Sequence, residues 1–256
     1  MVPLFSLALL MTACKGSKDG QQEQAEADST YVAPEWSRDA VLYELNVRQF
    51  SDEGTFSAVE ERVGELAALG VDVIWFMPIH PIGEVNRKGP LGSYYSIKDF
   101  MEVNPEFGDM DDFRSLVNSI HDEGMYVMMD WVPNHSSWDN HLAEEHPDWY
   151  VKDEEGNFVS PYDWTDVIQF DWSTVSLQEY MMDALLFWVE DVDVDGYRVD
   201  HPHVTPADFW LEARLEMEKV KPVLMLAENE DRVEFFNNGF DINYSWELHH
   251  LMNQVA

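Results

Sequence analysis

The chain has 256 residues, of which 45% are hydrophobic and 13% aromatic, so it can bury a large core and general disorder is excluded. Fifty acidic against 15 basic residues give a formal net charge of −35. A surface this acidic repels nucleic acid and anionic membrane surfaces. We therefore expect no nucleic-acid partner, and a ligand that is neutral or cationic.

The N-terminus carries the pattern of an export signal. Val2 to Met11 form an almost unbroken apolar run, which is too short to span a membrane and is typical of a signal peptide. The run leads into Thr12-Ala13-Cys14, which resembles the lipobox of bacterial lipoproteins. Residues 1–14 are interpreted as a signal peptide with a lipobox, with an ordinary secretory signal as the alternative. We expect a secreted or cell-envelope protein that meets a membrane only through a lipid anchor at Cys14. The polar and acidic residues 15–35 predict a flexible linker.

From residue 41 onward, short apolar runs alternate with segments of helical periodicity. The runs predict strands at 41–47, 71–77, 125–132, 194–199, 223–227 and 240–244. Among the helices predicted between them, the first two end at Gly70 and Gly124, and the last runs to Val220. Ser57-x-x-Glu60 has the spacing of a capping box, and Thr205-Pro206 predicts an N-cap followed by proline at the first helical position.

The strands are apolar along most of their length, which is typical of a parallel sheet covered on both faces. A doubly wound sheet and a closed barrel both fit this alternation. A dinucleotide-binding sheet is disfavoured, because Arg48-Gln49-Phe50 follows the first strand in place of a glycine-rich turn. We expect an α/β fold of the TIM (β/α)8 barrel type, incomplete here. Residues 36–256 supply about six of its eight strands, and a small subdomain is inserted after strand 3 at about 136–174.

Carboxylates stand where two of these strands end. Asp200 closes one strand, Glu228 closes the next, and Arg198 lies on the same strand face as Asp200. Neighbouring parallel strands lie about 4.8 Å apart, so the two carboxyl groups approach the roughly 5–5.5 Å separation of a retaining glycosidase pair. We expect Arg198 to lower the pKa of Asp200 and keep it ionised. Glu228 has no basic neighbour in the sequence and is expected to keep its proton.

Three segments, in order and each at a predicted strand end, resemble the conserved regions of the α-amylase family, glycoside hydrolase family 13. They are Asp130-Trp131-Val132-Pro133-Asn134-His135, Gly196-Tyr197-Arg198-Val199-Asp200 with His203, and Leu226-Ala227-Glu228-Asn229. The resemblance implies that Asp200 is the nucleophile and Glu228 the general acid/base. It also implies substrate-binding residues, which are Tyr95, His135, Arg198 and His203. Asp130 is then a structural partner that orients Arg198.

The resemblance also bears on cofactors and on the inserted segment. Asn134 matches a calcium ligand of many members, so a structural calcium ion is a candidate there, and no other cofactor is expected. The histidine that usually follows the second region is Val204 here, which weakens the calcium match. Four aromatic residues of the inserted segment either stack on sugar rings or form a small core of that segment: Trp138, Trp149, Tyr150 and Trp164.

The function that the resemblance implies is retaining hydrolysis of α-glucans such as starch and maltooligosaccharides, through a covalent glycosyl-enzyme. A catalytically inactive carbohydrate-binding relative is the alternative. The family uses a third carboxylate, an aspartate after an Asn-His pair near the seventh strand, whereas neither Asn134-His135 nor Asn140-His141 is followed by an aspartate here. We therefore expect an N-terminal fragment of a longer enzyme that is nearly inactive by itself, an expectation that brisk turnover of maltooligosaccharides would overturn.

Overall fold

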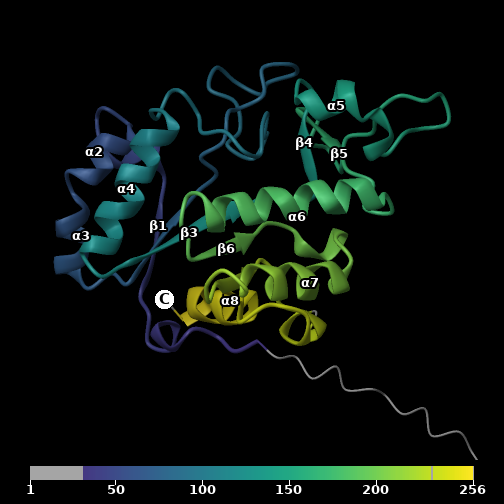
Figure 1. The fold of residues 1–256 in the computed structure, drawn as a ribbon. Coiled ribbons are helices and arrows are strands. Elements are labelled where there is room, and N and C mark those ends of the chain that lie inside the picture. Colours follow the sequence, from purple (N-terminus) through teal and green to yellow (C-terminus); the bar gives the residue numbers. More distant parts are fainter. Residues whose placement is uncertain (1–30, 232, 256) are drawn as a thin grey trace, which may run out of the picture.

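The computed structural model describes residues 31–231 and 233–255, which form an open, curled sheet with helices along its outer face (Figure 1). The predicted signal peptide, Cys14 and residues 15–30 of the predicted linker lie outside the described residues. Within the described residues, no helix is long and apolar enough to cross a membrane.

Six strands form the sheet, and all neighbouring pairs are parallel. In spatial order they are β1 (Leu42–Leu45), β2 (Val73–Phe76), β3 (Tyr126–Trp131), β6 (Gly196–Val199), β7 (Leu224–Ala227) and β8 (Ile242–Asn243). Each strand lies inside a run predicted from the sequence. β1 and β8 are the two edges of the described sheet, so it is a half-barrel, which confirms the prediction of an incomplete TIM barrel.

The helices follow the strands in the expected alternation. They are α1 (Val47–Phe50), α2 (Phe56–Glu60), α3 (Val63–Leu69), α4 (Met110–Asp122), α6 (Val175–Glu190), α7 (Ala207–Met217) and α8 (Trp246–Val255), with short 3-10 turns η1 (Glu35–Ser37), η3 (Pro202–Val204) and η4 (Val233–Asn237). α4 shows why such a helix forms. Asp109 and Asp112 make a reciprocal capping box at its start, and Phe113, Leu116 and Ile120 bury one stripe against the core.

Alternation along the strands divides the core into two layers. Ile74, Val127 and Tyr197 face outward into the large cluster that the helices cover. The alternate residues of β2, β3 and β7 face the inside of the half-barrel. They are Val73, Trp75, Met128, Leu224 and Leu226. Trp36 stacks on Tyr126 on this inner side, with ring centroids 3.9 Å apart. Both faces of the sheet are thus apolar, as the uninterrupted strands predict.

The predicted insertion after the third barrel strand forms a small subdomain. β4 (His135–Ser137) pairs antiparallel with β5 (Val167–Gln169), and α5 (His141–Glu145) and the turn η2 (Pro147–Trp149) lie between them. Figure 1 shows this segment beside the start of α6. Its residues stand next to the strand ends where the polar side chains gather.

Two predicted helix starts are wrong. Thr55, not Ser57, caps α2 by accepting a hydrogen bond from the Ala58 N–H, and the predicted single helix is split into α2 and α3. The Glu60 carboxylate accepts hydrogen bonds from Ser115 and Ser119 on α4 instead of returning to its own helix.

At the second start, α7 begins at Ala207 with Pro206 as N-cap, and no side chain caps it. The buried Thr205 hydroxyl makes no hydrogen bond in the described structure.

The predicted linker also ends earlier than expected. The Tyr31 hydroxyl donates to the Phe236 carbonyl at 2.7 Å and accepts from the Gly239 N–H at 2.9 Å. The guanidinium of buried Arg214 lies 4.9 Å from the centre of the Tyr31 ring. Residue 31 is therefore fixed to α7 and η4 by contacts that no local pattern predicts.

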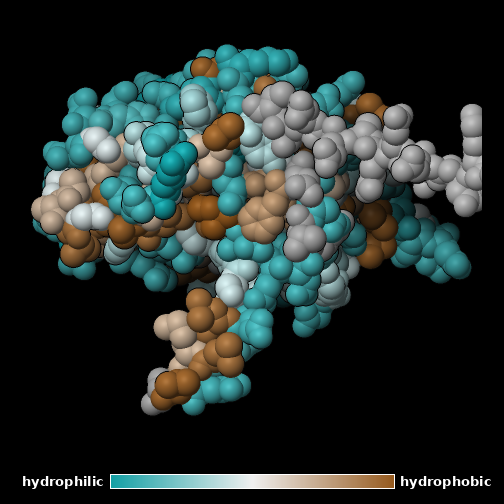
Figure 2. Space-filling model, turned by 90° about the horizontal axis from the view of Figure 1, so that it is seen from below, coloured by the Kyte–Doolittle hydropathy of each residue, from teal (hydrophilic) through white to brown (hydrophobic). Residues whose placement is uncertain are grey.

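α8 differs from the other long helices because none of its residues is buried. Figure 2 shows it projecting from the body of the molecule with apolar residues on its surface. The exposed apolar side chains are Trp246, Leu248, Leu251, Met252 and Val255.

Gly196 stands where the neighbouring strand leaves no room for a side chain. A Cβ atom built there would lie 2.0 Å from the Leu224 carbonyl oxygen, which belongs to the paired strand and cannot move freely. We predict that Gly196→Ala lowers the free energy of unfolding by at least about 2 kcal/mol. The measurement is urea unfolding followed by circular dichroism.

Gly64→Ala is the matched control. Gly64 is exposed on α3, and a Cβ there would meet only the Glu123 side chain at 3.7 Å. Alanine favours a helix over glycine by up to about 1 kcal/mol, so this variant should match or exceed the parent protein in stability. Equal stability of the two alanine variants would contradict the prediction.

Candidate active site

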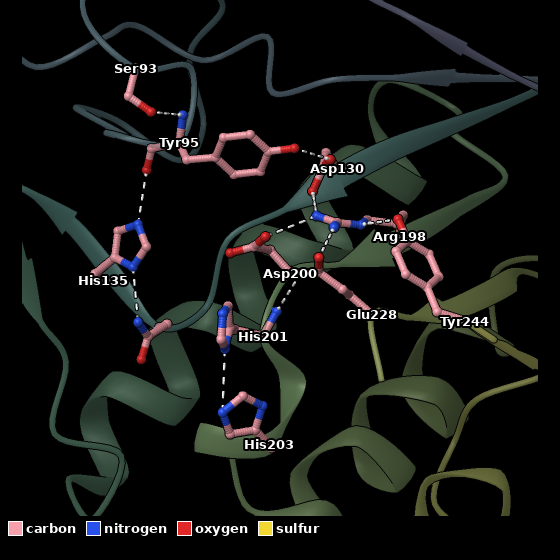
Figure 3. Close-up of polar contacts among 11 residues, drawn as sticks. Ser93, Tyr95, Asp130, His135, Arg198, Asp200, His201, His203, Glu228 and Tyr244 are labelled. Atoms are coloured by element: carbon pink, nitrogen blue, oxygen red, sulfur yellow. Dashed lines mark hydrogen bonds and ion pairs between the residues drawn. The ribbon is translucent and has the colours of Figure 1, made fainter. Parts of the chain in front are cut away.

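The site lies where β3, β6 and β7 end, on the inner face of the sheet (Figure 3). Arg198 pairs in register with Asp130 on one side and with Leu226 on the other. Leu226 faces the inside of the half-barrel, and Asp200 and Glu228 lie two positions beyond Arg198 and Leu226. Strand alternation therefore points Asp130, Arg198, Asp200 and Glu228 into the same space.

Arg198 connects these carboxylates through one guanidinium. Its Nη1 donates to Asp130 Oδ1 at 2.8 Å and to Asp200 Oδ1 at 3.0 Å, and its Nη2 lies 2.9 Å from Glu228 Oε1. Its Nε donates to the Tyr244 hydroxyl at 3.1 Å. Arg198 is only 4% exposed, so these bonds form with little competition from water. The Asp200 and Glu228 carboxyl groups are thus held close together on one cation.

Burial decides the charge state of this cluster. Removal from water raises the pKa of Asp200 to about 8; Arg198 opposes the shift, and the Asp130 and Glu228 carboxylates add to it. Burial also raises the pKa of Asp130 to about 7 against the pull of Arg198. The expectation that Arg198 brings the pKa of Asp200 below its usual range is wrong, because burial raises that pKa and Arg198 is shared among three carboxylates. Both pKa shifts favour uptake of a proton by the cluster.

Glu228 is also less isolated than its sequence neighbours suggest. Besides its contact with Arg198, its Oε2 accepts a hydrogen bond from the His201 backbone N–H at 3.3 Å. The idea that Glu228 lacks a basic neighbour is wrong, because Arg198 reaches it from the adjacent strand. Its side chain is 23% exposed, more than those of Asp130 and Asp200, so it faces the open part of the site.

Tyr95 and His135 form a second chain of bonds beside the cluster. The Tyr95 hydroxyl donates to Asp130 Oδ2 at 3.1 Å, and His135 Nε2–H donates to the Tyr95 carbonyl at 3.1 Å. His135 Nδ1 accepts from the Asn134 amide at 3.0 Å. Burial lowers the pKa of His135 to about 4, so the ring is neutral near pH 7. Both ring nitrogens of His135 therefore make hydrogen bonds to the protein, and the ring itself borders the site.

These groups surround a pocket of about 530 Å³, a usual size for a small-molecule site. It is lined by Lys88, Gly92, Ser93, Tyr95, His135, Trp164, Asp166, Val167, Arg198, Asp200, His201 and Glu228. Of the predicted substrate-binding residues, Tyr95, His135 and Arg198 are brought together here. His203 lies further out in η3, where its Nε2 is 3.3 Å from His201 Nδ1.

The four aromatic residues noted in the inserted segment take different places in the structure. Trp149 and Tyr150 are buried in the inserted segment, and Trp138 donates to the Thr165 carbonyl, whereas Trp164 reaches the pocket.

Lys88 and His201 also line the pocket, and no motif marked them as part of the site. Lys88 lies at the pocket because its Nζ pairs with Asp166 at 3.1 Å. The two residues are far apart in the chain, so no local motif predicts this pair.

A calcium ion at Asn134 stays a prediction. The Asn134 side chain is buried, and its amide nitrogen is bonded to His135. Calcium takes six to eight oxygen ligands, most of them carboxylates and carbonyls. Among the described residues, no three His, Cys, Asp or Glu side chains gather as metal ligands would. No step proposed below uses a metal ion.

Comparison with known proteins decides the family. The sequence pattern described as "Alpha amylase, catalytic domain" matches residues 18–169, more than half of the chain. The chain belongs to the α-amylase family, glycoside hydrolase family 13. The α-amylase MalA of Haloarcula japonica is 30% identical over an alignment of 239 residues, which covers 88% of this chain and 35% of MalA.

Further family members agree. An α-1,4-glucan:maltose-1-phosphate maltosyltransferase of Pseudomonas aeruginosa is 34% identical over an alignment of 200 residues, which covers 68% of this chain and 30% of the enzyme. The crystal structure of an α-amylase from Lactobacillus plantarum superposes with a TM-score of 0.80 at 38% identity, covering 84% of this chain and 55% of that one. This chain thus spans about a third of the length of the curated family members that it matches.

The cluster predicts a large stability effect at Arg198. Arg198→Met removes the cation and leaves three carboxylates without their partner, two of them buried. We expect the free energy of unfolding to fall by about 3–5 kcal/mol, measured by chemical unfolding at pH 7. Arg38→Met is the control, because Arg38 and its partner Glu35 are exposed and such a pair contributes at most about 1 kcal/mol. Similar losses in the two variants would contradict this account of the cluster.

Proposed function

We propose that this chain carries the nucleophile and the general acid/base of a retaining α-glycoside hydrolase that acts on α-glucans. One observation carries the proposal: Asp200 and Glu228 follow neighbouring strands and bind the same guanidinium. A retaining pair is about 5–5.5 Å apart, whereas an inverting pair needs roughly 6.5–9.5 Å to admit water between the sugar and the base. Two carboxyl groups held on one cation suit the shorter separation.

The two carboxyl groups then act in sequence. Asp200 attacks the anomeric carbon as Glu228 gives its proton to the departing oxygen, which leaves a glycosyl ester on Asp200. Glu228 next takes a proton from water, the water oxygen attacks the same carbon, and the ester bond to Asp200 breaks. The pair needs one shared proton at the start, and the raised pKa of Asp200 supports a cluster that holds a proton at neutral pH.

The pocket supports a neutral sugar as substrate. Its charged residues are mostly paired with one another, as Lys88 is with Asp166 and Arg198 with the carboxylates. Tyr95 borders the pocket with its ring beside the carboxylate cluster, where it can pack on the sugar whose bond is cleaved. The relatives named above are α-amylases and an α-1,4-glucan maltosyltransferase, which supports α-glucans as the substrate class.

We also propose that the active enzyme includes residues beyond this chain, among them the third carboxylate of the family. Support comes from the six strands of an eight-strand architecture and from the 55% of the Lactobacillus plantarum chain that is matched. The enzymatic tests below therefore use the full-length protein.

Covalent trapping tests the proposed mechanism. An activated 2-fluoro glycoside should label Asp200 of the full-length protein, because it forms the glycosyl ester on the nucleophile and hydrolysis of that ester is slow. The labelled residue is identified by mass spectrometry of the peptides. Asp200→Asn is the matched control and should stay unlabelled. Glu228→Gln should lower kcat on maltooligosaccharides by about 10³-fold. It should lower kcat far less on maltosyl fluoride, whose leaving group needs no proton.

Failure to label any carboxylate of the wild-type protein would favour an inactive carbohydrate-binding relative. Labelling at a residue other than Asp200 would refute the assigned nucleophile. An equal loss on both substrates in Glu228→Gln would refute its role as acid.

We propose that the protein is exported and anchored through a lipid on Cys14. The apolar run followed by Thr12-Ala13-Cys14 supports this, and the polar segment up to residue 30 supplies a tether. Cys14→Ser should abolish incorporation of labelled palmitate and move the protein out of the membrane fraction of a bacterial host. Wild-type protein that is unlabelled and soluble would contradict the anchor.

A further inference from the structure

Tyr244 is the fourth hydrogen-bond partner of the Arg198 guanidinium, and neither the motifs nor the proposed mechanism uses it. Nη1 of Arg198 donates to Asp130 and Asp200, and Nη2 contacts Glu228. The remaining nitrogen, Nε, donates to the Tyr244 hydroxyl at 3.1 Å. Burial raises the pKa of Tyr244 to about 12, so the hydroxyl is neutral at pH 7. Of these four partners, Tyr244 is therefore the one that carries no charge.

Aromatic rings also reach Arg198 from both sides of its strand. Its guanidinium carbon lies 5.4 Å from the centre of the Trp75 ring and 5.5 Å from the centre of the Tyr244 ring. Trp75 stands on β2, two strands from β6 in one direction, and Tyr244 follows β8, two strands away in the other. Aromatic faces attract a guanidinium and favour a stacked orientation. Both rings and the hydroxyl thus restrict how the guanidinium can turn.

The place of Tyr244 is set by the segment that carries Glu228. β7 and β8 pair Ala227 with Asn243, so Glu228 and Tyr244 are the next residues of the two strands. The Tyr244 N–H donates to the carbonyl of Asn229, which follows Glu228, at 3.1 Å. Figure 3 shows the Tyr244 and Glu228 side chains both pointing at Arg198. In the described structure the pocket is lined by Arg198 and Glu228 but not by Tyr244.

We propose that Tyr244 is a positioning residue, which orients the Arg198 guanidinium so that Nη1 binds the nucleophile and Nη2 binds the acid/base. This inference rests on the proposed function, because it uses the roles of Asp200 and Glu228. Without an acceptor for Nε, the guanidinium can swing about its side-chain bonds, and at least one carboxylate contact lengthens. Charge-assisted hydrogen bonds weaken with distance and misalignment. Tyr244 would thus act on the reaction without touching the substrate.

The groups around Arg198 show which charge depends on this orientation. Its titratable neighbours come from five elements or the loops after them: Tyr95, Asp130, Asp200, His201, Glu228 and Tyr244. Burial raises the pKa of both tyrosines and lowers that of His201, so these three are neutral near pH 7. The carboxyl groups remain to exchange a proton. Burial raises the pKa of Asp200 to about 8 while Arg198 opposes the shift. A guanidinium that swings away opposes it less, so the cluster keeps its proton to higher pH.

Tyr244→Phe in the full-length protein is the decisive variant, because it keeps the ring and removes only the acceptor of Nε. We expect kcat for maltotetraose to fall about tenfold, since the chemical step depends on the orientation of the two carboxyl groups. KM should stay within about twofold of wild type, because Tyr244 does not line the described pocket. The alkaline limb of the kcat/KM profile should move up by about half a pH unit.

Two further variants separate the hydroxyl from other causes. Tyr126→Phe removes a hydroxyl from the same inner layer, at the start of β3, whereas Asp130 stands near the end of that strand. It should leave kcat and the alkaline limb unchanged. Tyr244→Leu removes the ring as well and should lose at least as much kcat as Tyr244→Phe. If only Tyr244→Leu is impaired, ring packing is what matters, and orientation by the hydroxyl is wrong.

The pH dependence of stability tests the same contact without turnover. Carboxyl groups of an unfolded chain ionise near pH 4, whereas Asp200 keeps its proton to about pH 8 in the folded protein. Between these values the folded state binds more protons, so this group costs stability as the pH rises. In Tyr244→Phe the loss continues to higher pH. The gap in unfolding midpoint between wild type and Tyr244→Phe should therefore be wider at pH 9 than at pH 6, and the gap for Tyr126→Phe should not change.

The two readouts distinguish this inference from the proposed function. If wild-type protein does not hydrolyse maltotetraose and the Tyr244→Phe gap still widens with pH, the hydrolytic function fails while the control of Arg198 by Tyr244 stands. If hydrolysis is confirmed and the alkaline limb of Tyr244→Phe does not move, Tyr244 is not a positioning residue. A gap of equal size at both pH values shows a merely structural role and also overturns the inference.

Discussion

The guanidinium of Arg198 is the interaction on which the site depends. It binds three carboxylates that stand on or after three neighbouring strands, β3, β6 and β7. Side chains alternate along a strand, so a slip of one residue between these strands would turn a carboxylate away from its only strong partner. Leaving a buried charge without a partner is costly. Strand register, local stability and the spacing of the Asp200 and Glu228 carboxyl groups therefore depend on one another.

One cation does not neutralise three carboxylates, two of them buried, and the proposed mechanism uses this excess of negative charge. Burial and mutual repulsion raise the pKa values of Asp130 and Asp200, so the cluster takes up a proton near neutral pH. A retaining mechanism needs one carboxyl group protonated and the other ionised. In the proposed mechanism the more exposed Glu228 faces the departing group, while Asp130 lies buried behind Arg198 and the Tyr95 hydroxyl. The same crowding thus gives chemically identical groups different tasks.

Sequence patterns predicted the fold well and its fine structure less well. Each predicted strand and the inserted segment are present, because the apolar runs must be buried whatever their neighbours are. The helix starts at Ser57 and Thr205 were wrong, because local cap patterns compete with tertiary partners such as the hydroxyl groups that take up Glu60. The prediction that Arg198 lowers the pKa of Asp200 was wrong for a similar reason. Sequence spacing placed one carboxylate beside Arg198, whereas the folded sheet brings three to it.

Local patterns in the sequence were enough to predict a parallel α/β sheet, the strand ends that carry Asp130, Arg198, Asp200 and Glu228, and the likeness to the α-amylase family. These depend on period-two alternation and on motifs that are local in the chain. Only the tertiary structure decided that Glu228 shares its cation with Asp200, that Trp164 faces the pocket while Trp149 is buried, and that Tyr162 meets His201. Such contacts join segments dozens of residues apart. Their geometry follows from how the inserted segment packs beside the sheet, and no spacing along the chain encodes that packing.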